Sequence, residues 1–231
     1  MTIAENYQKI RRELPEHVTL VIAAKTRTKQ EILELIVAGV TDIGENYVQE
    51  AQQVYSALGE DAKRLRWHMI GHLQTNKINK ALSIFDFIQT IDSYKKAQAI
   101  DKRVEAAGKS IVPVYIEINI GSEFAKAGIK PEEHEPFEEY MVKLIRDMSE
   151  LEHLRVEGLM TMGPRSGDPE DSRPYFRQTK KLFDILRELN IPNVDMKTLS
   201  MGMSNSYKVA IEEGSNMIRL GTIVFGERKY D

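Results

Sequence analysis

The sequence predicts an α/β protein: a single (β/α)8 (TIM) barrel domain over residues 1–231 with an extra N-terminal helix. Short apolar runs alternate with helical stretches along the whole chain, which is the pattern of repeated βα units. Several runs are nearly continuous in Val, Ile, Leu and Met, as expected of strands covered on both faces. A polar residue follows each run. A barrel gathers such residues from every unit, whereas an open sheet concentrates its ligands at one switch point.

The eight strands are expected at residues 18–25, 40–45, 66–71, 85–90, 112–119, 155–161, 195–200 and 216–221. Two pairs of residues have the spacing of a capping box, namely Thr2 with Glu5 and Thr28 with Glu31. They predict the extra N-terminal helix and a first barrel helix over about residues 29–38. Further helices are expected to begin at capping residues and to end before glycines. The caps are Asp92 or Ser93, Asp168 (followed by Pro169) and Ser204, and the glycines are Gly39, Gly108 and Gly214.

Composition limits the class of protein. A chain of 231 residues with 42% hydrophobic content can bury a large core without disulfides. Cysteine is absent, which excludes thiol catalysis, cysteine-ligated zinc and iron–sulfur clusters. The start of the chain is polar, and no apolar run approaches the thickness of a bilayer. We therefore expect a soluble cytoplasmic protein that does not bind a membrane.

Charge is spread along the chain, with 32 Lys and Arg against 35 Asp and Glu and a net charge of −3. No basic block stands out, so we expect no nucleic-acid partner, although a local cationic pocket for one phosphate is compatible with this pattern. No exposed apolar stripe stands out, and a closed barrel has no free sheet edge, so we expect a monomer.

Lys25 ends the first predicted strand and is followed at once by turn and helix-start residues. An ordinary lysine rarely ends a buried strand unless its ammonium has a partner. A lysine that forms a Schiff base must be partly desolvated to lose its proton near neutral pH, and a strand mouth suits that requirement. The alternative is a lysine that extends from a strand end into solvent.

Two neighbouring turns are predicted to bind an anion. Residues 199–204 join the seventh strand to a helix, so that their amides and the hydroxyls of Ser200 and Ser204 favour a phosphate. Gly221 and Thr222 follow the eighth strand, and the loops after strands seven and eight are the frequent phosphate site of such barrels. The alternative is that Ser204 is only a helix cap and Gly202 a turn residue.

Arg219 lies inside the last predicted strand, where a guanidinium needs a partner to tolerate burial. One hypothesis is an ion pair with an acid such as Glu45. The other is a hydrogen bond to the ring nitrogen of a cofactor. A permanently charged arginine opposite a pyridine nitrogen would keep that nitrogen unprotonated and would weaken carbanion chemistry.

Seven stretches in this order resemble the pyridoxal phosphate homeostasis protein family. They are AAKT at 23–26, GENY at 44–47, WHMIGHLQTNK at 67–77, TIDS at 90–93, GLMTM at 158–162, LSMGMS at 199–204 and RLGTIVFG at 219–226. The resemblance implies a barrel of the alanine racemase type that holds pyridoxal 5′-phosphate (PLP), a vitamin B6 form, as an internal aldimine. It implies a role in PLP homeostasis without a dedicated reaction, with apo PLP-dependent enzymes as candidate receivers.

The resemblance also implies roles for ten residues. Lys25 is the Schiff-base lysine, Asn46 lies near the ring hydroxyl and Arg219 faces the ring nitrogen. The phosphate is held by Ser200, Ser204 and the amides of Gly221 and Thr222, and the ring is surrounded by Ile70, His72 and Met201. None of these is expected to be a catalytic residue.

Two other functions are open alternatives. An amino-acid racemase needs a second acid or base opposite Lys25, and in racemases that share the barrel this group comes from an extra β domain. Only residues 226–231 follow the last strand region, so we expect no more than weak side activity. A phosphate-metabolite isomerase would explain the phosphate turns but would leave Lys25 without a role.

His68 and His72 are too far apart along a strand to favour a metal site, and no metal is expected.

Overall fold

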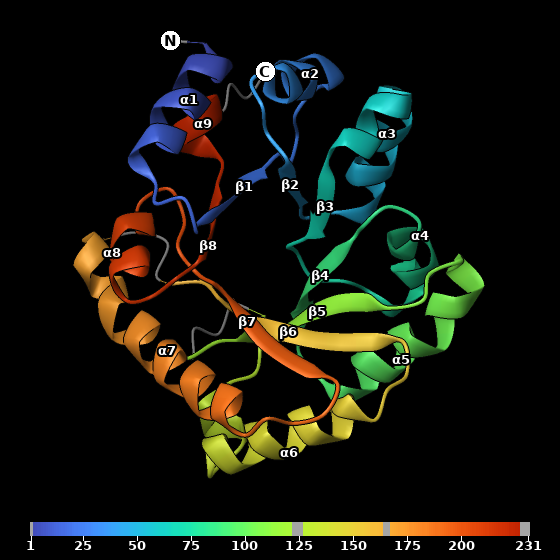
Figure 1. The fold of residues 1–231 in the computed structure, drawn as a ribbon, viewed down its shortest axis with the longest axis vertical. Helices are drawn as coiled ribbons and strands as arrows, with labels where there is room; N and C mark the ends of the chain where they lie inside the picture. Colours follow the sequence, from blue (N-terminus) through green and yellow to red (C-terminus); the bar gives the residue numbers. More distant parts are fainter. Residues whose placement is uncertain (1, 122–126, 164–166, 227–231) are drawn as a thin grey trace.

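The computed structural model describes residues 2–121, 127–163 and 167–226. Within them, eight parallel strands form a closed barrel in sequence order, with β8 next to β1 (Figure 1). The strands are β1 (Thr19–Ala23), β2 (Asp42–Glu45), β3 (Arg66–Met69), β4 (Phe87–Ile91), β5 (Val112–Ile118), β6 (Leu154–Thr161), β7 (Val194–Ser200) and β8 (Met217–Leu220). Each lies where the sequence predicts a strand, so the predicted fold is confirmed.

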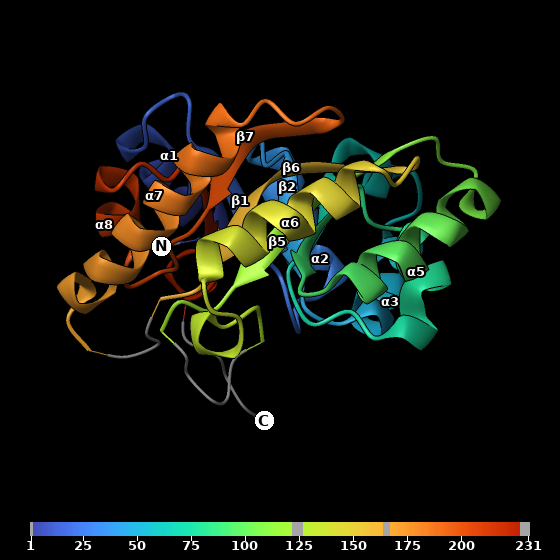
Figure 2. The same ribbon diagram turned by 90° about the horizontal axis from the view of Figure 1, so that it is seen from below.

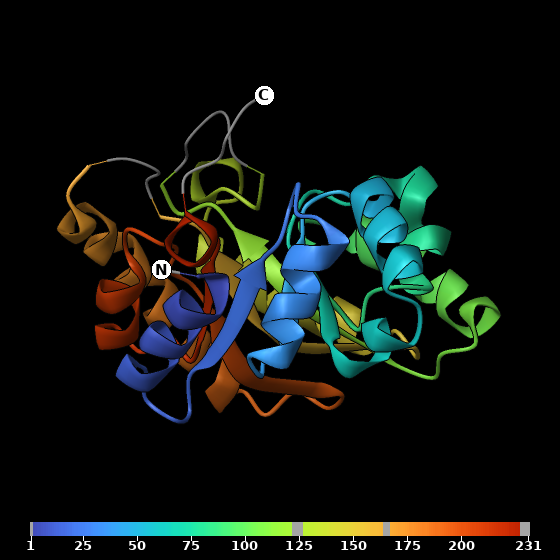
Figure 3. The ribbon, with the colours of Figure 1, turned by 90° about the horizontal axis from the view of Figure 1, so that it is seen from above.

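Helices surround the barrel and cover the outer face of the sheet (Figure 1). In the described residues they are α1 (Ile3–Glu13), α2 (Lys29–Val37), α3 (Val48–Leu58), α4 (Ile78–Leu82), α5 (Tyr94–Val104), α6 (Phe137–Ser149), α7 (Arg173–Glu188), α8 (Tyr207–Glu212) and α9 (Thr222–Phe225). Figure 2 shows α6 across the outer side of β5 and β6, with α5 beside it. Figure 3 shows α1 and α2 on the same side of the molecule as β1.

Most of the predicted helix ends are confirmed. Thr2 and Thr28 each form a complete capping box, at the start of α1 and α2. Ser93 caps α5 by accepting a hydrogen bond from the amide of Lys96. Gly39, Gly108 and Gly214 all have a positive φ angle at the end of a helical segment. These signals act over three or four residues, which explains why the sequence alone could place them.

Asp168 caps a helix start as predicted, with Pro169 in the first turn, and this short 3-10 helix (Pro169–Ser172) leads directly into α7. One prediction near a helix end was wrong. Ser204 does not cap α8, which begins three residues later at Tyr207. The hydroxyl of Ser204 instead faces the amide of Gly221, at 3.4 Å. The region after β8 folds into the short helix α9, which the sequence analysis did not predict.

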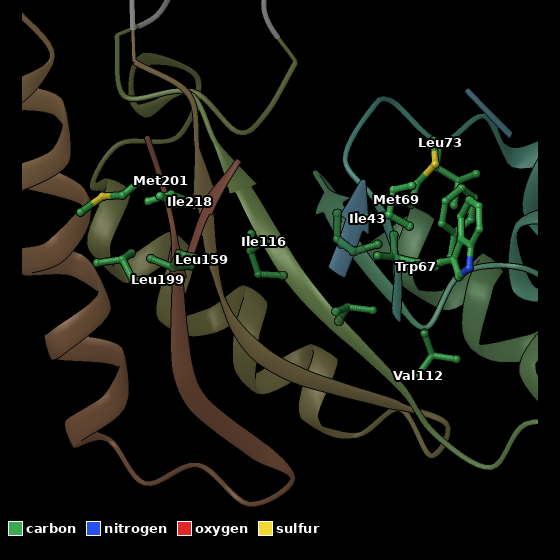
Figure 4. Packing of buried hydrophobic residues seen from close by; sticks show 14 of the residues in the cluster. Ile43, Trp67, Met69, Leu73, Val112, Ile116, Leu159, Leu199, Met201 and Ile218 are labelled. Carbon is green, nitrogen blue, oxygen red and sulfur yellow. The ribbon is translucent and has the colours of Figure 1, made fainter. Parts of the chain in front are cut away.

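The larger hydrophobic core lies between the barrel and its helices. Trp67 on β3 is almost fully buried, and its indole nitrogen donates to the carbonyl of Ala62 at 3.0 Å. Figure 4 shows Ile43, Met69 and Leu73 close to this side chain. A second, separate cluster contains Val21, Tyr115, Met160 and Met217, from β1, β5, β6 and β8. No described helix combines the length and the hydropathy needed to cross a membrane.

Candidate functional site

A cavity of about 620 Å³ opens at the carboxyl ends of the strands. Eight of the ten predicted site residues line it: Lys25, Asn46, Ile70, His72, Ser204, Arg219, Gly221 and Thr222. Side chains two positions apart on a strand share a face. The second hydrophobic cluster therefore lies inside the barrel, beneath the cavity, because its members precede by two the lining residues Ala23, Glu117, Met162 and Arg219.

Lys25 is half-buried and comes two residues after the end of β1. The amide of Ala24 donates to the carbonyl of Gly44 at 2.9 Å, which continues the pairing of β1 with β2 up to the lysine. The chain then turns sharply at Thr26, whose φ angle is +66°. The amide of Thr26 donates to a carboxylate oxygen of Glu50 at 3.2 Å. Lys25 is thus held between a paired strand and a fixed turn, at the edge of the cavity.

The turns after β7 and β8 lie side by side at the cavity. Gly202 has a φ angle of +100°, and a Cβ there would lie 2.7 Å from the Cβ of Ala210, so the turn requires glycine. The amide of Arg219 donates to the carbonyl of Gly202 at 3.0 Å, which ties this turn to β8. As a result the Ser204 hydroxyl and the Gly221 amide face each other at 3.4 Å. The Ser204 hydroxyl and the Gly221 amide therefore lie together at the cavity.

Arg219 is only 5% exposed. Its Nη1 donates to the hydroxyl of Ser200 at 2.6 Å, and its Nη2 donates to the carbonyl of Thr161 at 2.8 Å. Burial lowers the pKa of this guanidinium to about 10, with Glu117 acting in the opposite direction. Arg219 therefore remains a cation at neutral pH. The hypothesis of an ion pair with Glu45 is wrong, because Ser200 and Thr161 are the groups that Arg219 contacts.

Ser200 and Met201 are not among the residues that line the cavity. The Ser200 hydroxyl is fully buried, donates to Gln89 at 2.7 Å and accepts from Arg219, so its one proton is already used. Met201 is fully buried in the core between barrel and helices. The reason is the alternation of side chains along β7, which turns Ser200 into the barrel below Arg219. Cofactor binding by these two side chains stays a prediction that their positions do not favour.

Glu117, which the sequence analysis missed, also lines the cavity. It is 2% exposed, and its Oε2 has no hydrogen-bond partner among the described residues. Burial and the nearby Asp92 raise its pKa to about 7, against the opposing effects of Arg219 and Lys96. The available signal was a lone acid within the otherwise apolar strand β5. At neutral pH this carboxyl can therefore gain or lose a proton inside the cavity.

His72 and His68 do not form one site. His72 is exposed at the cavity edge, with its Nδ1 3.5 Å from the Lys96 ammonium, which pairs with Asp92 at 2.6 Å. His68 is fully buried in the barrel, and its Nε2 lies 2.9 Å from Asp42. The part of the chain that the structure describes holds no group of three or more His, Cys, Asp or Glu side chains that could bind a metal ion.

Glu45, at the end of β2, is another buried acid, and the charge of Lys25 acts on it. Burial raises its pKa to about 8, and Glu50 adds to the rise, while a backbone hydrogen bond from Asn46 and the charge of Lys25 oppose it. Its Oε2 has no hydrogen-bond partner among the described residues. Glu45 is therefore mostly protonated at pH 7, and it does not hold a proton on Lys25 as an ionised acid would.

Replacing Glu45 with glutamine should remove a pH-dependent loss of stability. The folded-state pKa of about 8 lies above the ordinary value, so the folded protein keeps a proton that the unfolded chain has lost. Wild-type stability should therefore fall as the pH rises through this interval. Glutamine cannot ionise, so E45Q should be more stable than wild type at pH 9, by on the order of 2 kcal/mol, and nearly equal to it at pH 5.

Urea unfolding of the cofactor-free protein at the two pH values measures this difference. The exposed Glu16 offers a matched control, because E16Q removes the same charge without removing a buried acid. The same pH dependence in E45Q and wild type would show that Glu45 is already ionised in the folded protein.

Comparison with known proteins places the chain among proteins of one barrel type. The family model for the N-terminal domain of alanine racemase matches residues 1–229. A pyridoxal phosphate homeostasis protein of Aquifex aeolicus is 42% identical over 210 residues, which cover 90% of this chain and 86% of the relative. PipY of Synechococcus elongatus PCC7942, in a structure with PLP bound, is similar with a TM-score of 0.86 and 30% identity, over 97% of this chain and 100% of PipY.

An alanine racemase of Clostridium difficile 630 shares the fold at lower sequence similarity. The TM-score is 0.78 and the identity 18%, over 100% of this chain and 58% of the racemase. The barrel predicted from the sequence is therefore also found by comparison with solved structures.

Proposed function

Because the chain belongs to the pyridoxal phosphate homeostasis protein family, we propose that it binds PLP as a Schiff base on Lys25 and contributes to intracellular PLP homeostasis. The observation that supports this best is the convergence of one half-buried lysine, two hydroxyl- and amide-bearing turns and one buried cation on a single cavity. The relatives' printed names agree with it, as does PipY, whose structure has PLP bound.

The lining residues fit the chemical groups of PLP. Its phosphate would be held by the hydroxyl of Ser204 and the amides of Gly221 and Thr222, at the two adjoining turns. Gly221 lets the backbone come close, since a Cβ there would lie 3.2 Å from the carbonyl of Ala23. The Gly221 amide is 3.4 Å from Ser204, long for a hydrogen bond between protein groups, so an anion could replace that contact.

The ring would lie between the strand ends above the barrel interior. Arg219 would face the ring nitrogen, Asn46 the ring hydroxyl, and Ile70 and His72 would flank the ring. As a permanent donor, Arg219 cannot supply a proton to the ring nitrogen, so the bound ring would be a weak electron sink. This is why the proposal includes PLP binding and no dedicated reaction.

Lys25 must be neutral to react with an aldehyde. Arg27 and Arg219 line the same cavity as Lys25, so the lining of the proposed site includes two other cationic side chains. Burial raises the pKa of Glu45 to about 8, so this acid is mostly uncharged at pH 7. The Lys25 amine would condense with the aldehyde that bound PLP would supply, with loss of one water. The bond is reversible, which suits a protein that stores PLP and releases it.

We propose a cytoplasmic monomer, a single domain over residues 1–231, that buffers free PLP and delivers it to apo PLP-dependent enzymes. Slow amino-acid racemisation by the same lysine is the alternative function. The position of Glu117 favours racemisation, because a buried acid with a pKa of about 7 in the cavity could exchange a proton with a bound amino acid.

Two measurements test this proposal. Titration of the purified protein with PLP should produce the absorbance band of a protonated Schiff base at one equivalent. The loaded protein should then leave enantiomerically pure alanine, serine and glutamate unchanged over hours. Rapid racemisation that is lost in E117Q would replace the homeostasis function by an enzymatic one, and the absence of any absorbance change would overturn PLP binding.

A further inference from the structure

A chain of hydrogen bonds crosses the interior of the barrel from Arg219 to Asp42. Arg219 Nη1 donates to Ser200 Oγ at 2.6 Å, and Ser200 Oγ donates to Gln89 Oε1 at 2.7 Å. Gln89 Nε2 lies 3.0 Å from His68 Nδ1, and His68 Nε2 lies 2.9 Å from Asp42 Oδ1. The four links join five of the eight strands, β8, β7, β4, β3 and β2, and run from the cavity wall to the opposite rim of the barrel.

Every link of this chain has a fixed direction. A guanidinium only donates, so Ser200 must accept from Arg219 and pass its own proton to Gln89. The amide oxygen of Gln89 is then the acceptor, and its nitrogen donates to His68 Nδ1. His68 is left with a proton on Nε2, which it donates to the carboxylate of Asp42. Both ends of the chain require donation to run from Arg219 to Asp42, because Arg219 cannot accept a hydrogen bond and an ionised Asp42 cannot donate one.

The ends of the chain carry opposite charges. Burial alone would raise the pKa of Asp42, but hydrogen bonds from His68, Arg66 and Thr41 together lower it, so it is an anion. Arg66 reaches this carboxylate from the solvent side, at 2.6 Å and with 55% of its side chain exposed. Burial lowers the pKa of His68, which keeps the imidazole neutral and able to accept from Gln89. Arg219 thus contacts an anion indirectly, through three neutral residues.

The surroundings of the chain offer few other partners. Gln89 and Ser200 are both fully buried. The ring of Phe87 stacks on His68 at 4.5 Å between centroids, and the sulfur of Met217 accepts weakly from Gln89 at 3.3 Å. A buried polar group that loses its partner here cannot turn to water. Removing Gln89 should therefore release the Ser200 hydroxyl and weaken its hold on Arg219 Nη1, so that the guanidinium keeps only its bond from Nη2 to the Thr161 carbonyl and can reorient about it.

We propose that Gln89 is a positioning residue for PLP, which acts through Ser200 to hold the Arg219 guanidinium in one orientation at the cavity. This inference rests on the proposed function, since it assigns to Arg219 the place opposite the ring nitrogen. It also gives Ser200 a role beneath Arg219 instead of at the phosphate. A network that merely fills the core would change stability when broken, but it would not change the state of Arg219 or the binding of PLP.

The first variant is Q89M, which keeps the length and approximate volume of the side chain and removes both strong links. Titration with PLP should show affinity reduced about tenfold, the usual effect of one lost buried hydrogen bond. The Schiff-base absorbance maximum should also shift, because the partner of the ring nitrogen has moved. Thr179 offers a matched control, since it is fully buried in α7 and donates to the carbonyl of Tyr175 at 2.8 Å, remote from this chain. T179V should lose stability and keep wild-type affinity and absorbance.

The second measurement needs no cofactor. In the 15N NMR spectrum of the unliganded protein, the Arg219 side-chain signals, assigned with R219K, should shift and exchange faster with water in Q89M than in wild type or T179V. If Q89M does not fold, S200A removes a single oxygen from the next link and should give the same changes. The double variant should be no worse than the more affected single variant, because either substitution breaks the same chain.

Unchanged Arg219 signals together with unchanged PLP affinity in Q89M or S200A would overturn the inference. Additive effects of the two substitutions on PLP affinity would do the same, since they would show two independent contacts. If the wild-type protein gave no PLP absorbance at all, the proposed function would fail, and the NMR signals would still decide whether Gln89 holds Arg219.

Discussion

Replacement of Lys25 by alanine should abolish the Schiff-base absorbance of the protein completely. Lys25 lines the cavity, and the paired end of β1 and the turn at Thr26 hold its backbone in place. Alanine keeps this backbone and removes the only atom that we propose to bond to the aldehyde. PLP should still bind weakly through its phosphate, without a covalent bond. Absorbance titration and mass spectrometry after borohydride reduction measure the two effects.

Lys29 provides the control for this substitution. It is exposed at the first position of α2, four residues from Lys25, and K29A should behave as wild type in both assays. A full Schiff-base band in K25A would assign the bond to another lysine. In that case the turns after β7 and β8 could still bind the phosphate, but the aldehyde of PLP would not lie at Lys25.

Replacement of Gly71 by alanine should damage both the fold and the site. A Cβ at this position would lie 2.3 Å from the carbonyl oxygen of Asn46 and 2.7 Å from its Cα, so the backbone just after β2 or just after β3 must shift. Such overpacking costs about 2 kcal/mol of stability. Because Asn46 is a proposed ligand of the ring hydroxyl, PLP affinity should also fall, by about tenfold or more. Thermal unfolding and PLP titration measure the two losses.

Substitution of Gly108 is the control that separates the effect of G71A on the site from its effect on the fold. It has a φ angle of +73° after α5, and a Cβ there would meet nothing within 4 Å. G108A should therefore cost about 1 kcal/mol through its backbone conformation alone and leave PLP affinity unchanged. Wild-type affinity in G71A would show that Asn46 does not contact the cofactor.

Local sequence signals were sufficient for the barrel and for much of the cavity. Strands buried on both faces read as apolar runs, and capping boxes at Thr2 and Thr28 set helix starts within four residues. Residues that follow a strand in a barrel necessarily come to its carboxyl end. This explains why Lys25, Asn46 and Gly221 could be placed at one cavity without knowledge of the strand register.

The remaining features depend on which way a side chain points and on what lies opposite. Ser200 was predicted to be at the phosphate, but the pleat of β7 turns it toward Gln89 and Arg219. Gln89 and Glu117 lie within apolar strands and give no motif, so their roles follow only from closure of the barrel. The start of α8 was misplaced because Ser204 looks like a cap locally, whereas its partner is Gly221 on the next turn.

The central claim is that the Lys25 amine reacts with an anchored aldehyde in the cavity. Borohydride reduction of the wild-type protein with one equivalent of PLP, followed by proteolysis and mass spectrometry of the peptides, tests it most directly. We expect a single pyridoxyl mark, on Lys25. An unmodified Lys25, or a mark spread over several surface lysines, would contradict the account.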